Sequence, residues 1–287
     1  MNILKFIFLG FVLSLLYPPY FLLPLGFLIF TYLCLLCDNY SKNKHLGKLF
    51  LSAYFFSFGF FLSFFFWIKN PFLVYAETKN LFLLFILLII ILSAISAIIF
   101  TIFLHYNKII STFIAIPLAF TLIEFSFSKI FYGFPWITSS LILSNNIFLL
   151  NLVKYQGTLF SSYVLIQLFC LPYYLFFNKK NKIIIFYFLI TCVLPLSFSI
   201  FFNLNLNNKV SNSNDLINFE IHQMNIPVIQ NKSEKEKTLN EIYKKIYKSN
   251  SDLLIFSENN FPFLVADKNL KKIQEKLKNN QIVIIGG

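Results

Sequence analysis

The sequence contains no arginine, and charged residues of both signs make up only 13% of it. A typical soluble domain is about 25% charged. Hydrophobic residues, by contrast, make up 57% of the chain, and the mean hydropathy is +0.71. This balance excludes a water-soluble globular protein over most of the length and indicates a membrane protein.

Cysteine is also scarce, and its placement argues against a disulfide framework. The four cysteines (Cys34, Cys37, Cys170 and Cys192) lie in apolar runs, and Cys34-x-x-Cys37 has no second pair or nearby histidine. Buried cysteine usually behaves as a small hydrophobe. The net charge of +12 comes from lysines that fall between apolar runs rather than along one face. We therefore expect no metal, no cofactor and no nucleic-acid partner.

Apolar runs follow one another through the first two hundred residues. About twenty apolar residues cross a bilayer as a helix. A signal peptide is the competing interpretation of the first run. The run lacks a small-x-small cleavage site, however, and continues through Pro18-Pro19 into another apolar run. The sequence thus predicts an all-α bundle over residues 1–202 with about seven spans, near residues 3–16, 20–37, 49–67, 81–104, 109–127, 147–177 and 183–202.

The lysines between the spans predict an orientation. Alternate connections differ in lysine content, and the richer ones belong in the cytoplasm together with the N-terminus. The rest of the chain then emerges on the opposite face, which is the periplasm in a bacterium. The richer set is Lys42, Lys44, Lys48, Lys108, Lys179, Lys180 and Lys182, against Lys69, Lys79 and Lys129.

The chain changes character after residue 202. Residues 203–215 form an Asn/Ser-rich linker, and hydrophobic residues then alternate with polar ones from Ile217 to His222, as in a strand. Ser233 and Glu236 have capping-box spacing before an amphipathic helix. Residues 253–256, 270–277 and 282–285 predict a strand, a helix and a strand. This order indicates the start of an α/β domain with a parallel sheet over 216–287.

Four places carry candidate functional residues. Glu124 and Lys154 are ionisable residues inside apolar runs, where charge is expensive unless it has a role or reaches the interface. Gly133-Phe134-Pro135-Trp136 predicts a rigid turn with Trp at headgroup level, as in an ordinary aromatic belt or a binding loop. Glu258 follows a buried strand at its carboxyl end, so it is a solvated loop acid or a general base.

These motifs are similar to those of a known family. Glu124, Tyr132–Trp136 and Gly157 match its E…TGFPW…G stretch, and residues 223–227 resemble its Q-G-N-I-P motif. Ile255–Glu258 with Phe261-Pro262 resembles its W-P-E-x-x-x-P motif, and residues 283–287 resemble its next strand. With these residues the chain resembles the first part of bacterial apolipoprotein N-acyltransferase, an inner-membrane enzyme with a nitrilase-like periplasmic α-β-β-α domain.

The sequence departs from the family pattern at four positions. An arginine expected three residues after the membrane glutamate is Phe127 here, and Met224 replaces a glycine. Ser257 replaces a proline, and Lys232 stands where a tryptophan is often found. These departures put substrate binding in question more than family membership.

The resemblance implies an activity and a site. In the family a Glu, a Lys and a Cys move an acyl chain from a phospholipid to the amino terminus of a lipoprotein's diacylglyceryl-cysteine. Glu258 matches the general base, and a substrate-binding role is implied for Glu124, Gly133, Phe134, Pro135, Trp136, Gln223 and Asn225. The Lys and the nucleophilic Cys match no residue here. We therefore expect an inactive fragment, a partial gene product, or a protein completed by a separate chain.

A membrane transport or scaffold protein with a small periplasmic cap is the alternative from another class. A transporter places ionisable groups near the bilayer midplane, often beside broken helices. The predicted spans are almost free of such groups.

Overall fold

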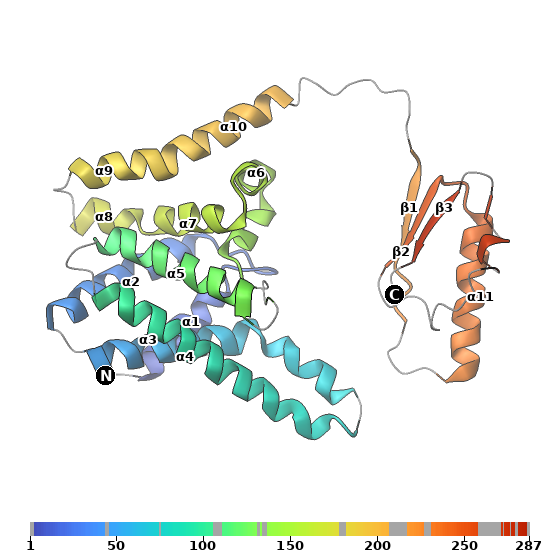
Figure 1. The fold of residues 1–287 in the computed structure, drawn as a ribbon, viewed down its shortest axis with the longest axis horizontal. Helices are drawn as coiled ribbons and strands as arrows, with labels where there is room; N and C mark the ends of the chain where they lie inside the picture. The colour runs from blue at the N-terminus through green and yellow to red at the C-terminus, as the bar shows by residue number, and fades with distance from the viewer. Residues whose placement is uncertain are drawn as a thin grey trace. The chain divides into compact units, whose positions relative to one another are not determined.

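A computed structural model of the chain shows a mostly helical protein that ends in a small sheet (Figure 1). It describes residues 3–43, 46–74, 76–105, 111–130, 133, 137–177, 182–206, 217–226, 231–257, 271, 273–275, 277–278 and 281–285. The chain forms two compact units, Met1–Val210 and Ser211–Gly287. The first is a helix bundle and the second is built around the sheet.

The bundle contains α1 (Ile3–Ser14), α2 (Pro24–Asn43), α3 (Leu46–Phe64), α4 (Leu83–His105) and α5 (Thr112–Lys129). It continues with α6 (Ile147–Gln156), α7 (Thr158–Phe169), α8 (Leu171–Phe177), α9 (Lys182–Phe188) and α10 (Leu194–Leu206). Shorter 3₁₀ segments are η1 (Phe66–Leu73), η2 (Lys79–Phe82) and η5 (Ser139–Asn145), and one wide π turn, η6 (Leu189–Val193), joins α9 to α10.

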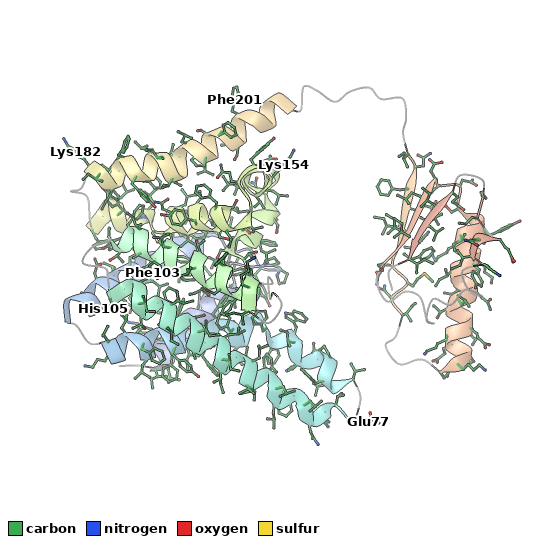
Figure 2. The ribbon with its side chains drawn as sticks, viewed as in Figure 1. Glu77, Phe103, His105, Lys154, Lys182 and Phe201 are labelled. Carbon is green, nitrogen blue, oxygen red and sulfur yellow. The ribbon has the colours of Figure 1, made fainter. Side chains whose placement is uncertain are left out.

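Among the described residues, five helical segments are long and apolar enough to cross a membrane, which supports a helical membrane domain but does not confirm the predicted count of about seven spans. They are Leu46–Phe64, Lys79–His105, Thr112–Lys129, Thr158–Phe177 and Lys182–Phe201, and Ile3–Ser14 and Pro24–Asn39 are shorter apolar helices. Figure 2 shows Glu77 and His105 near opposite ends of the second segment, and Lys182 and Phe201 marking the last. Glu77, His105 and Lys182 thus lie at or beside the ends of these segments, where an ionisable group reaches water cheaply.

The predicted span 147–177 is wrong at its start. Gly157 has a φ of +79°, which ends α6 and begins α7, so the long apolar segment starts at Thr158. Glycine adopts this backbone region without the steric cost that a Cβ would bring. Lys154, near the end of α6, is exposed, and its ammonium lies 5.3 Å from the centre of the Tyr155 ring.

Helices α1 and α3 pack with their backbones nearly in contact. A Cβ added at Gly59 of α3 would lie 2.1 Å from the carbonyl oxygen of Ile7 in α1. A Cβ at Gly10 of α1 would lie 2.0 Å from the carbonyl oxygen of Phe56 in α3. Lipid supplies no hydrophobic force between helices, so such close packing at small residues is a main source of their association.

Polar side chains join other helices of the bundle. Thr112 at the start of α5 and Tyr173 in α8 both donate hydrogen bonds to the carboxylate of Asp38 in α2. The last span is joined to α7 by the Tyr163–Tyr187 pair and by Thr191, which donates to Gln167 at 2.9 Å. Such hydrogen bonds contribute about 0.6–2 kcal/mol each inside a membrane.

The second unit confirms the predicted parallel sheet. Its strands are β1 (Phe219–His222), β2 (Leu253–Phe256) and β3 (Ile282–Ile285), in the order β1-β2-β3, with α11 (Lys232–Lys248) between the first two. Ile242 and Ile246 of α11 are buried against Leu254 and Phe256 of β2. The predicted helix 270–277 falls partly outside the described residues, but its Ile273 is buried in the same core.

The opposite face of the sheet is apolar and exposed. Phe219 and Ile221 of β1 are 62% and 64% exposed, and Ile282 and Ile284 of β3 are 61% and 50% exposed. None of the described residues covers this face, whereas a parallel sheet is normally covered on both.

The predicted capping box is wrong by two residues. Asn231, rather than Ser233, is the N-cap of α11, and its side chain accepts a hydrogen bond from the backbone of Glu234 at 2.9 Å. The Glu234 carboxylate in turn accepts from the Asn231 backbone at 2.9 Å. Asparagine is among the best N-cap residues, and Ser233 supports it by donating to the Asn231 side chain at 2.8 Å.

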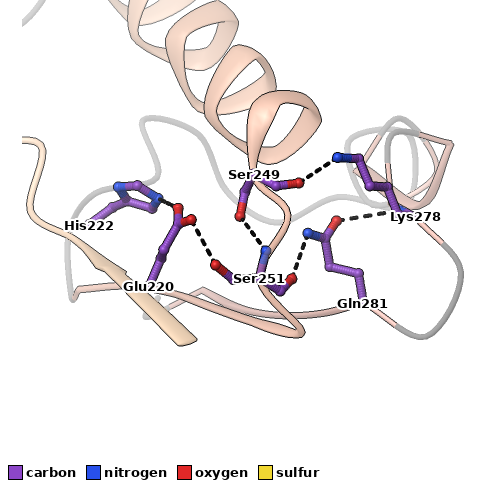
Figure 3. A network of polar contacts seen from close by, with 6 residues as sticks. All are labelled: Glu220, His222, Ser249, Ser251, Lys278 and Gln281. Atoms are coloured by element: carbon purple, nitrogen blue, oxygen red, sulfur yellow. Dashed lines mark hydrogen bonds and ion pairs between the residues drawn. The ribbon is translucent and has the colours of Figure 1, made fainter. Parts of the chain in front are cut away.

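A polar network ties the amino ends of β2 and β3 to the end of α11 (Figure 3). The Ser251 hydroxyl donates to Glu220 at 2.7 Å, and its carbonyl accepts from the Gln281 amide at 2.9 Å. Lys278 donates to the Ser249 carbonyl at 2.7 Å. The hydrogen bond from Ser251 lowers the pKa of Glu220 below its usual value, so the carboxylate is ionised at neutral pH.

The α1–α3 contact predicts that one added methyl group destabilises the bundle at Gly59 but not at Gly47. Gly59→Ala should destabilise the bundle by about 1–3 kcal/mol because its Cβ meets the Ile7 backbone, which cannot move aside alone. Gly47→Ala on the same helix meets nothing within 4 Å and should be neutral or slightly stabilising. Thermal unfolding of the purified chain in detergent measures both. Equal melting temperatures for the two variants would contradict the packing described.

Candidate functional site

Glu124 lies inside the bundle and not on its surface. It is in α5, is 3% exposed, and its Oε1 accepts two hydrogen bonds from Ser139. The Ser139 backbone nitrogen donates at 2.8 Å and the Ser139 hydroxyl at 2.6 Å. The Ser139 hydroxyl is also 3.1 Å from the Tyr17 hydroxyl, just after α1. The carboxylate thus joins α5, the end of α1 and the segment η5.

The segment η5 is held from a second side as well. The Ser140 backbone nitrogen donates to the hydroxyl of Ser162 in α7 at 2.9 Å, and both residues are buried. Two neighbouring residues of η5 therefore bond to two different helices.

The aromatic motif 133–136 directly precedes this anchored segment. Gly133 has a φ of +95° and its backbone nitrogen donates to the Ile130 carbonyl at 3.0 Å, which makes a tight turn at the end of α5. Phe134, Pro135 and Trp136 lie outside the described residues, and Ile137 beyond them is 4% exposed. Both ends of the motif are thus fixed, one by the turn and one by the Glu124–Ser139 contact.

A second group of candidates lies at the carboxyl ends of β1 and β2. Gln223 follows β1 directly and Ser257 follows β2, and the Ser257 hydroxyl donates to the Gln223 side chain. The Ser257 backbone nitrogen donates to the His222 carbonyl at 3.3 Å. Asn225 has a φ of +49°, in the left-handed region that asparagine tolerates better than most residues. The predicted base Glu258 is the next residue along and lies outside the described residues.

The cysteines and the acids do not assemble into a metal centre within the described part of the chain. No group of three or more His, Cys, Asp or Glu side chains there is placed to hold an ion. All four cysteines are free and buried within the bundle.

Comparison with known proteins bears on these two places in the chain. The family model described as the apolipoprotein N-acyltransferase N-terminal domain matches residues 9–171, more than half of the 287. The chain belongs to the apolipoprotein N-acyltransferase family. A search of curated proteins found no match.

The matched region of this N-acyltransferase domain contains the first of the two places. Residues 9–171 include Glu124, Gly133, Ser139 and Ser162, so this group of residues lies wholly inside the family's N-terminal domain. The last helical segment and the sheet unit lie beyond the match. The assignment of Gln223, Asn225 and Glu258 stays a prediction from the motifs.

The four residues that depart from the family pattern all lie among the described residues. Phe127, in place of an arginine, is 1% exposed and its ring centre lies 5.8 Å from that of Phe61. Met224, in place of a glycine, packs against the core of the sheet unit. Ser257, in place of a proline, supplies the hydroxyl that binds Gln223. Lys232 is the first residue of α11.

Three residues of the membrane site could not be found from the motifs. Tyr17, Ser139 and Ser162 surround Glu124, but Tyr17 is 122 positions away from Ser139. The signal that could have indicated Ser139 was the buried carboxylate itself, which needs donors inside the bundle.

The Glu124–Ser139 contact predicts that removing the Ser139 hydroxyl destabilises the segment around it. Ser139→Ala should loosen residues 137–145, because a hydrogen bond to a carboxylate contributes roughly 1.5–3 kcal/mol. Hydrogen exchange of the backbone amides in that segment should become about tenfold faster or more. Ser144→Ala is the matched control, since the Ser144 hydroxyl bonds only the Leu141 carbonyl of its own segment, at 2.7 Å. Unchanged exchange in Ser139→Ala would contradict the anchoring role.

Proposed function

We propose that the chain provides the membrane domain and the general base of an apolipoprotein N-acyltransferase. The reaction transfers an acyl chain from a phospholipid to the α-amino group of a lipoprotein's diacylglyceryl-cysteine. The observation that supports this most is the family match over residues 9–171. Because that match names an acyltransferase domain, it favours this reading over the transport or scaffold alternative.

The substrate-binding part of the proposal rests on the two anchored places. Gly133, Phe134, Pro135 and Trp136 are proposed to contact lipid at the membrane surface, where Trp is favoured. Glu124 is buried, so we propose that it acts on this turn through Ser139. Gln223 and Asn225 are proposed to bind substrate at the carboxyl ends of the strands, where open α/β sheets place their sites.

The catalytic part assigns Glu258 as the base. As a cysteine thiol attacks the ester carbonyl of the phospholipid, Glu258 takes the thiol proton, a thioester forms, and the lysophospholipid leaves. The lipoprotein amine then attacks the thioester, an amide forms, and the thiol is released. An unassisted thiol with a pKa of about 8.5 is mostly neutral at pH 7, so the base is needed for the first step.

The nucleophile of this scheme is not among the cysteines of the sequence. Cys34, Cys37, Cys170 and Cys192 are all buried within the bundle. We therefore propose that the 287 residues alone do not form the acyl-thioester and that a further polypeptide segment, in the same chain or another, supplies the Lys and the Cys.

The proposed location is the bacterial inner membrane. The lysine-rich connections support a cytoplasmic N-terminus, and with about seven spans we propose that the sheet unit, as the start of a nitrilase-like domain, lies in the periplasm. This count includes the shorter apolar helices Ile3–Ser14 and Pro24–Asn39 with the five longer segments.

The orientation is tested by a reporter that is active only in the periplasm. Fused after residue 210, it should be active, because an odd number of spans carries that point across the membrane. The same reporter fused after His105, on the proposed cytoplasmic side, should be silent. An inactive fusion at 210 with normal expression would overturn the orientation.

The role of Glu258 is tested in a system that supplies the Lys and the exposed Cys, in cis or as a second chain. Glu258→Gln keeps the size of the side chain but cannot accept the proton, so acyl-enzyme formation should fall by about 10²–10⁴. Capture of acylated protein from labelled phospholipid measures it. Asp267→Asn is the matched control and should label normally, because Asp267 is expected from the sequence to be an acid in the first turn of the next helix. Normal labelling of a well-folded Glu258→Gln protein would refute the assignment.

A further inference from the structure

A small cavity lies in the bundle beside the Glu124 carboxylate. It is lined by side chains of α1, α3, α4 and α5 together with Tyr17 and Ile137, and its volume is about 20 Å³. A cavity of roughly 10–15 Å³ is enough for one water molecule. Most of the lining is aromatic or aliphatic, and its polar members include Glu124, Ser96 and Ser57.

Two polar atoms in the lining have no hydrogen-bond partner among the described residues. Both Ser139 hydrogen bonds go to Oε1 of Glu124, which leaves Oε2 buried without a donor. The Ser96 hydroxyl in α4 is likewise buried without a partner. Ser96 is 1% exposed and Ser57 of α3 is 3% exposed.

Such atoms are costly to leave unpaired. A buried donor or acceptor without a partner costs about 1–3 kcal/mol, and more when the group is charged. The cost is not relieved by lipid, which offers no donors. A water molecule resolves it, because it donates to a carboxylate and bonds a hydroxyl at once, and buried waters typically have about three protein partners. A larger ligand does not fit the volume.

We propose that a buried water molecule occupies this cavity and bridges Oε2 of Glu124 to the hydroxyl of Ser96, with Ser57 as its third partner. The water completes the coordination of a carboxylate whose other oxygen fixes Ser139. Glu124 thereby connects α4, through the water, to the turn that begins at Gly133. The water site does not depend on the acyl-transfer proposal, because it follows from the bundle alone.

Ser96→Ala is the variant that separates a hydrated cavity from a dry one. In a hydrated cavity it removes a partner of the water, and the melting temperature of the purified full chain should fall by roughly 2–6 °C. In a dry cavity it removes an unpaired hydroxyl, so the melting temperature should stay constant or rise. A constant or raised value would overturn the proposal.

Ser93→Ala is the matched control on the same helix. Ser93 is as buried as Ser96, but its hydroxyl donates to the Ile89 carbonyl at 2.6 Å and does not line the cavity. Its melting temperature should change by no more than about 1 °C, since such a bond within a helix contributes little. A loss equal to that of Ser96→Ala would show that any buried serine of α4 matters equally, and would overturn the water site.

A double-mutant cycle tests the bridge itself. The losses from Glu124→Gln and Ser96→Ala should not add, because both remove partners of one water, whereas those from Glu124→Gln and Ser93→Ala should add. The hydroxyl of Ser162, which accepts from the Ser140 backbone, is the alternative donor for the Glu124 carboxylate. If Ser162→Ala is non-additive with Glu124→Gln and Ser96→Ala is additive, the second oxygen is satisfied by Ser162 and the proposal is wrong.

Discussion

A carboxylate buried in a membrane bundle must obtain its hydrogen bonds from its own chain. Glu124 obtains two from Ser139, and this need determines where the connection after α5 can lie. Ser140 bonds Ser162 next to it, and Tyr17 reaches the same point from the end of α1. The connection after α5 is therefore held at Ser139 and Ser140 by polar contacts within the bundle.

Where lipid surrounds the helices, packing takes over the role that the hydrophobic effect has in water. The helices of the bundle associate through close backbone packing at one place and through interhelical hydrogen bonds at another. Helices α1 and α3 approach at Gly10 and Gly59 until their backbones touch. The last span has few buried residues, and polar side chains join it to α7, among them the Tyr163–Tyr187 pair.

Hydropathy and periodicity predicted the helical membrane domain and the parallel sheet because both follow from local composition. The break at Gly157 was missed because it lies within a long and predominantly apolar stretch, and the φ of +79° that separates α6 from α7 is a feature of the backbone. The N-cap at Asn231 was missed because Asn231 and Ser233 both have a glutamate three positions on, and local sequence does not choose between them. The partners of Glu124 come from distant parts of the chain, and no local pattern encodes such contacts.

The crossing of α1 and α3 has a consequence at the level of the gene. Glycine codons begin with two guanines, whereas the abundance of Phe, Ile, Asn and Lys indicates coding DNA rich in A and T. Any single-base change at either guanine of the codon for Gly10 or Gly59 introduces a residue with a Cβ, or a stop, and no other amino acid fits the space. Mutation toward A and T at these two codons is therefore expected to be selected against, because it would place a Cβ between two helix backbones.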